Sequence, residues 1–122
     1  CNQVAAVQKI IQDNDFTFQV ADYTEILDKV SESDFLYIDS PYIGLNVQYK
    51  DSWNQENSDD LSERLLKLKS NFAMSMWQSN KYRQNSYLDR FAGLGKVTYE
   101  HFYHVGSKAE YRNSVTEALI YN

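Results

Sequence analysis

The feature that most constrains this chain is the run FLYIDSPY at residues 35–42, which contains the only proline among the 122 residues. Its first five residues favour β structure, and a short apolar run that ends in turn-forming residues predicts a buried strand. The run closes with Asp39, Ser40, Pro41 and Tyr42. In an open α/β sheet, ligands bind beyond the carboxyl ends of the strands. An acid, a carbonyl and an aromatic ring at this point therefore indicate a site.

Hydrophobic periodicity along the rest of the chain predicts an α/β organisation. Strands are expected over residues 16–20, 35–39 and 72–77, and a closing hairpin is expected to pair residues 96–105 with 116–121. Two short helices are expected over residues 24–30 and 80–91. A third is expected to begin at Asn2 and to carry Val4, Val7, Ile10 and Ile11 on one face. A fourth is expected to begin at Ser58–Asp60 and to carry Leu61, Leu65 and Leu68 on one face. The polar stretch 43–57, with Tyr49 and Trp53, is long enough for a lid or a binding loop.

Composition indicates one small core and gives little sign of general nucleic-acid affinity. Hydrophobic residues make up 43 % of the chain and the net charge is −5. One cysteine excludes an internal disulfide framework and suits a reducing cytosol. The charge is uneven, because residues 1–49 carry two lysines against eight acids, whereas residues 80–122 carry six basic residues against four acids. This C-terminal third could meet phosphates through Lys81, Arg83, Arg90, Lys108 and Arg112, or these side chains could form a solvated face.

The residue types at 39–42 suit methyl transfer to an amino group on a base. An exocyclic amine is a poor nucleophile because its lone pair is delocalised into the ring. Two acceptors, the Asp39 carboxylate and the Ser40 carbonyl, would favour a more tetrahedral nitrogen. Pro41 restricts Ser40 to extended conformations and offers no competing N–H, and Tyr42 offers a ring for stacking. An ordinary junction between a strand and a turn would use the same residue types.

The tetrapeptide resembles the DPPY signature of amino-group DNA methyltransferases, with Ser40 where that family usually has proline. Residues 21–27, ADYTEIL, resemble the acidic-aromatic motif that DNA adenine methyltransferases of the Dam-like family carry upstream of DPPY. By this resemblance, Asp22 and Tyr23 would border the adenine of S-adenosylmethionine, and Asp39 would also lie at the cofactor. Asp22 could equally be a helix N-cap, with Glu25 closing a capping box. Residues 108–113 and 115–122 also resemble the end of that family's catalytic domain.

A glycine-rich cofactor turn is missing from this sequence. Such a turn lets the backbone approach a cofactor closely and follows a strand. Gly93 and Gly95 instead follow a helical pattern and are interpreted as a helix stop. The resemblance therefore implies a fragment: residues 1–15 would be a helix that follows an absent target-recognition domain, and residues 16–122 would be the C-terminal half of the catalytic domain.

The implied fold is an α/β, Rossmann-like methyltransferase sheet that keeps strands 3 to 7, with a C-terminal antiparallel hairpin, and lacks its first two strands. The family's strand order is 3-2-1-4-5-7-6, so residues 16–20, as strand 3, would be separated from the strand that ends at Asp39. An exposed strand edge and exposed apolar helix faces would follow. We therefore expect the fragment to self-associate or to leave the family's sheet around residues 16–20, and to bind S-adenosylmethionine very weakly.

By resemblance, the parent protein would be a cytoplasmic, nucleoid-associated bacterial enzyme that acts without a metal. It would transfer a methyl group from S-adenosylmethionine to the amino group of an adenine flipped out of double-stranded DNA, as in restriction-modification or Dam-like methylation. The catalytic residues would be Asp39, Ser40, Pro41 and Tyr42. Two alternatives stay open: an RNA or protein acceptor, and an inactive remnant or scaffold.

Two further patterns resemble sites. Residues 100–104, EHFYH, suggest metal ligands, but His101 and His104 would point to opposite faces of a strand. The ten tyrosines suggest base stacking, yet half-buried strands use the same residue type. Only Tyr42, with Tyr49 and Trp53 in the loop, is therefore considered for stacking. Ser75 is interpreted either as a match to a serine on the family's next strand or as an ordinary serine at the core edge.

Overall fold

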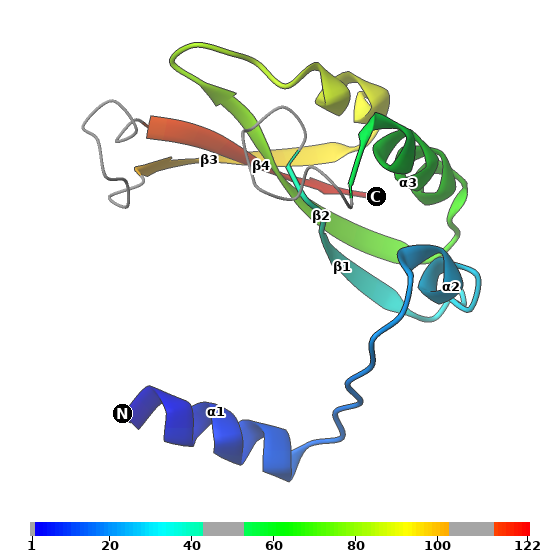
Figure 1. Ribbon diagram of the computed structural model, residues 1–122, viewed down its shortest axis with the longest axis vertical. Helices are drawn as coiled ribbons and strands as arrows, with labels where there is room; N and C mark the ends of the chain where they lie inside the picture. The colour runs from blue at the N-terminus through cyan, green and yellow to red at the C-terminus, as the bar shows by residue number, and fades with distance from the viewer. Residues whose placement is uncertain (1, 43–52, 103–113) are drawn as a thin grey trace.

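The computed structural model describes residues 2–42, 53–102 and 114–122 of the chain. These residues build one four-stranded sheet in the order β1 (Phe35–Asp39), β2 (Asn71–Asn80), β4 (Ser114–Tyr121), β3 (Gly95–Phe102) (Figure 1). β1 and β2 are parallel, and β4 lies antiparallel between β2 and β3. The expected α/β class, the strand over 72–77 and the closing hairpin are confirmed, apart from residues 103–105 of the hairpin, which lie outside the described residues.

One face of the sheet packs against helices and forms the core. α2 (Tyr23–Leu27), α3 (Gln55–Lys67) and the 3-10 helix η1 (Ser86–Phe91) lie on this face, to the right of the sheet in Figure 1. Alternate side chains of β2 and β4 point into it, so Phe72, Met74 and Ile120 are each at most 1 % exposed. Two leucines of α3, Leu61 and Leu65, complete the contact, as their helical spacing predicts.

The expectation that β1 is a buried strand is wrong. Its exposure alternates: Leu36 and Ile38 are half-buried, whereas Phe35 and Tyr37 are 66 % and 65 % exposed. The reason is position, because β1 is the edge strand of the sheet and the described residues cover only one of its faces. The outer edge of β1 therefore has no partner strand among the described residues.

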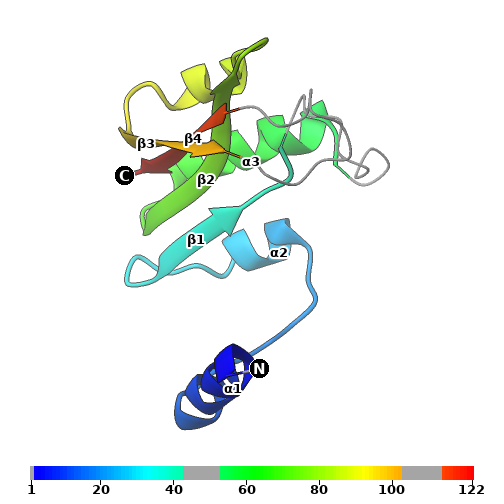
Figure 2. The same ribbon diagram turned by 90° about the vertical axis from the view of Figure 1, so that its left-hand side faces the viewer.

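The N-terminal region does not pack against the core formed by the described residues. Helix α1 (Asn2–Asp13) forms as predicted, but Val4, Val7 and Ile10 are each more than half exposed. Figures 1 and 2 show α1 standing apart from the sheet at the end of an extended segment. Residues 16–20 are not a strand, which corrects the prediction. Among the described residues they have no neighbouring strand with which to pair.

The predicted helix over residues 80–91 is wrong in its first half. β2 continues to Asn80, and a tight turn brings Gln84 back beside Ser79. The Asn80 side chain accepts hydrogen bonds from the backbone N–H groups of Tyr82 and Arg83, both at 2.9 Å. Asparagine side chains that bond to the local backbone compete with helix formation. Only residues 86–91 are helical, and they begin after a second capping asparagine, Asn85.

The other helices differ from prediction at their ends. α3 begins at Gln55 rather than at Ser58, because Asn54 caps it in a reciprocal capping box with Asn57. α2 ends at Leu27 rather than at residue 30. Residues 43–52 of the predicted loop over 43–57, including Tyr49, lie outside the described residues. Among the described helices, none has the length and apolar character that crossing a bilayer requires.

Candidate functional site

Asp39 lies at the carboxyl end of β1, directly opposite Ser75 of β2. Paired residues on neighbouring strands project from the same face. The Ser75 hydroxyl donates a hydrogen bond of 2.9 Å to Oδ1 of Asp39. The carboxylate is exposed, and its second oxygen has no hydrogen-bond partner among the described residues, so it can accept from an incoming donor. Ser75, which the sequence left undecided, therefore belongs to the candidate site.

Tyr42 lies close to the same group of side chains. Its ring is half-buried and packs against the core. Burial raises the pKa of the Tyr42 hydroxyl, and the carboxylates of Glu117 and Asp39 raise it further, while a hydrogen bond with Ser75 acts in the opposite direction. The phenol is therefore neutral at physiological pH. Ser40 and Pro41 precede it, half-buried, in backbone that is neither helix nor strand.

Sequence reasoning missed Glu117. This carboxylate is on β4, opposite Trp77 of β2, and is half-buried. A signal was present, because an acid in the middle of the mainly apolar run over 115–121 is unusual for a strand paired on both sides. The sheet thus brings Asp39, Ser75, Tyr42 and Glu117 to one region, although they come from three strands and the segment after β1.

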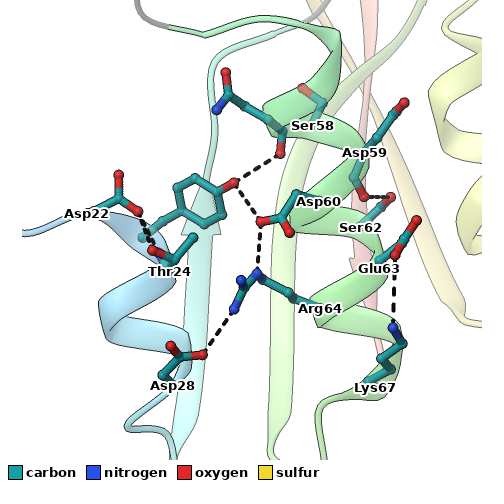
Figure 3. Close-up of polar contacts among 12 residues, drawn as sticks. Asp22, Thr24, Asp28, Ser58, Asp59, Asp60, Ser62, Glu63, Arg64 and Lys67 are labelled. Carbon is teal, nitrogen blue, oxygen red and sulfur yellow. Dashed lines mark hydrogen bonds and ion pairs between the residues drawn. The ribbon is translucent and has the colours of Figure 1, made fainter.

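Asp22 is the N-cap of α2, as one of the two interpretations predicted. Its Oδ1 accepts from the Thr24 backbone N–H at 2.9 Å and from the Thr24 hydroxyl at 2.6 Å. These hydrogen bonds, that of the Thr24 side chain first, lower the pKa of Asp22. The cap is made with Thr24 rather than with Glu25. Asp22 lies toward the carboxyl end of β1 and Asp28 toward its amino end (Figure 3). Helix α2 therefore starts near the carboxyl end of β1, where Asp39 lies.

Tyr23 holds α2 against α3. Its hydroxyl donates to Oδ2 of Asp60 at 2.8 Å, and its ring meets Trp53 edge to face with centroids 5.3 Å apart. Asp60 also accepts from Arg64 at 2.8 Å, and Arg64 reaches Asp28 at 3.0 Å (Figure 3). The hydrogen bond from Tyr23 is the main cause that lowers the pKa of Asp60. The first turn of α2 is therefore fixed in position, while Tyr23 and Trp53 stay partly exposed beside it.

The remaining candidates form no site in the part of the chain that is described. No group of three or more His, Cys, Asp or Glu side chains gathers there as metal ligands. His101 is exposed on β3, and its proposed partner His104 lies outside the described residues, as do Lys108 and Arg112. Arg90 is paired with Asp59 at 2.7 Å.

The chain matches the model of a known protein family. The family model described as D12 class N6 adenine-specific DNA methyltransferase matches residues 2–111 of the chain. No curated protein matches it. The matched range covers α1 to β3 and includes Asp22, Tyr23 and residues 39–42, on which the resemblance rested.

Proposed function

Because this chain belongs to the D12 class of N6 adenine-specific DNA methyltransferases, we propose that it is the C-terminal half of such an enzyme's catalytic domain. The observed strand order supports this. If β1, β2, β4 and β3 correspond to strands 4, 5, 7 and 6 of the expected sheet, the order 4-5-7-6 and the single antiparallel strand both follow. The exposed edge of β1 would then adjoin a strand supplied by the rest of the protein.

The observation that carries the proposal is the placement of Asp39. The carboxylate and the Ser40 carbonyl would accept the two hydrogens of the adenine amino group and hold its nitrogen toward the methyl donor. Ser75 would position the carboxylate through its 2.9 Å hydrogen bond to Oδ1, and the other oxygen, which has no partner among the described residues, would be left for the substrate. Tyr42 would stack on the extruded base, and its neutral phenol adds no charge beside it. Acceptors fixed in advance act mainly in the transition state.

S-adenosylmethionine is the donor we propose, and it would supply the methyl group as an activated sulfonium. The side chains at the start of α2 fit the adenine moiety of S-adenosylmethionine in part. Tyr23 and Trp53 present aromatic edges at the start of α2, and Oδ2 of Asp22 has no partner among the described residues and can accept from an amine. The Tyr23 hydroxyl is already used by Asp60, so only its ring is left for such a contact.

The test is methyl transfer by the complete protein that contains this sequence. Asp39→Ala is expected to lower the single-turnover rate on an adenine-containing duplex by several orders of magnitude, with DNA affinity changed only a few fold. The control is Asp13→Ala, which removes an exposed carboxylate from α1. A near-normal rate in Asp39→Ala would contradict the role of this carboxylate.

The fragment part of the proposal has its own test. Without the missing strands, the 122-residue chain is expected to self-associate through the edge of β1 and to bind S-adenosylmethionine very weakly. Sedimentation and calorimetric titration measure both properties. A stable monomer with micromolar affinity for the cofactor would show that the chain needs no further strands.

A further inference from the structure

The hairpin that follows β2 places basic residues beyond the edge of the sheet. Gln78 and Asn80 of β2 pair with the returning segment, as shown by the backbone hydrogen bonds from Asn85 N to Gln78 O at 2.8 Å and from Asn80 N to Arg83 O at 2.9 Å. In Figure 1, the end of β2 projects past its neighbours before the chain returns to η1. Lys81 and Arg83 flank the exposed Tyr82 at its tip. This hairpin replaces the first half of the predicted helix.

A polar pocket of about 360 Å³ lies at the base of this hairpin. We call it the hairpin pocket; the residues used below are Gln55, Arg83, Gln84, Asn85, Ser86 and Arg90. Its described lining, which also includes Trp77 and Tyr87, contains two guanidinium groups, side-chain amides and two hydroxyls, and no carboxylate. This is unusual in a chain with a net charge of −5. The lining is rich in hydrogen-bond donors and suits an anion.

The existing contacts show which donors stay available to a ligand. Arg90 is held by Asp59 at 2.7 Å and lies over the Tyr87 ring, and Gln55 also donates to Asp59. Asn85 is consumed by the backbone of Trp77 and Tyr87. The side chains of Arg83, Gln84 and Ser86 make no hydrogen bond or ion pair within the described residues. The pocket therefore contains Arg90, which is fixed by its ion pair, and three side chains, those of Arg83, Gln84 and Ser86, whose donors have no partner among the described residues.

We propose that the hairpin pocket binds a backbone phosphate of the DNA substrate, with Arg83 as its main contact. This inference rests on the proposed function. β1 and β2 are parallel, so the hairpin extends from the sheet edge at which Asp39 lies. Asn80 is five residues beyond Ser75, or about 16 Å along an extended strand, which is roughly five base-pair steps of DNA. A phosphate contact at this distance would fix the duplex relative to the site without reading sequence.

The test measures binding of a 20-base-pair duplex to the complete protein at several salt concentrations. Arg83→Gln is expected to weaken binding about tenfold near 0.1 M salt and to reduce the slope of log K against log salt by about 0.9. Arg83→Lys keeps the charge and is expected to keep that slope. The matched control is Lys67→Gln, an equal charge change at the far end of α3, which is expected to leave affinity within twofold.

The outcomes separate this inference from the proposed function. If the unmodified protein binds and methylates DNA but Arg83→Gln behaves like Lys67→Gln, the phosphate site is wrong and the proposed function stands. If the unmodified protein neither binds nor methylates DNA, the proposed function itself fails. Titration with inorganic phosphate distinguishes a second source of the same chemistry. Saturation at micromolar phosphate, with no effect of Arg83→Gln on the duplex, would assign the pocket to a free anion instead.

Discussion

Two helices of this chain carry apolar residues at the same helical spacing and meet opposite environments. In α3, Leu61 and Leu65 are 3 % and 1 % exposed beneath the sheet, whereas in α1, Val4 and Val7 are 68 % and 55 % exposed. Periodicity thus identifies which face of a helix is apolar, but not whether the covering surface lies in the same chain. Twelve-residue helices are marginal in water on their own. Helix α3 has such a stabilising surface in the sheet, whereas α1 has none among the described residues.

The largest test of this comparison uses one residue type in both regions. Ile120→Ala removes a core side chain that is 1 % exposed and is expected to lower the free energy of unfolding by about 2–5 kcal/mol. Ile10→Ala acts at a side chain that is 54 % exposed, and is expected to change the free energy of unfolding by less than about 0.5 kcal/mol. Urea unfolding measures both. Similar losses would mean that α1 is packed in solution and would break the comparison.

A smaller effect is expected at the boundary between the two regions. Tyr23 is the first residue of α2, and its hydroxyl ties that helix to Asp60 of α3. Tyr23→Phe keeps the ring and is expected to cost about 1 kcal/mol of unfolding free energy. Tyr82→Phe serves as the control because its ring is 68 % exposed. Equal values for the two variants would show that the hydroxyl does not hold α2 in place.

The smallest effect is a pH dependence. Hydrogen bonds from Tyr23, and then from Arg64, lower the pKa of Asp60 in the folded state below its ordinary value of 3.8. The stabilisation is therefore fully present above pH 3.8 and is lost as pH falls through the lowered pKa. Melting temperatures between pH 6 and pH 2 should fall less steeply in Asp60→Asn than in the unmodified chain. Parallel curves would exclude Asp60 as a source of the acid sensitivity.

Local sequence patterns predicted much of the sheet and of the helices that pack against it. The strands at 35–39 and 72–77, the C-terminal hairpin, the cap at Asp22 and the buried face of α3 follow from alternation, helical spacing and capping residues. The strand at 16–20 failed because a strand needs a neighbour, and β tendency alone provides none. The helix at 80–91 failed in its first half because two asparagine side chains bonded to the backbone instead.

The candidate site was predictable only where it is continuous in sequence. Asp39 and Tyr42 lie within one run, and the resemblance assigned them together. Ser75 joins them through the pairing of β1 with β2, 36 positions after Asp39, and Glu117 through the pairing of β2 with β4. Such proximity follows from the register of β1, β2 and β4, which periodicity does not specify.

The position of β4 has a consequence for biosynthesis. It is the last strand in sequence, yet it lies between β2 and β3, and Asn122 beside it bonds to the backbone of Ser70 and Phe72. At 5–20 residues per second, the ribosome needs roughly 2–8 s to pass from the end of β2 to the end of β4. During that interval Met74 and Met76 lack their neighbours on β4, Ile120 and Ala118. The apolar residues of β2 therefore stay uncovered on the β4 side until the end of the sequence has been synthesised.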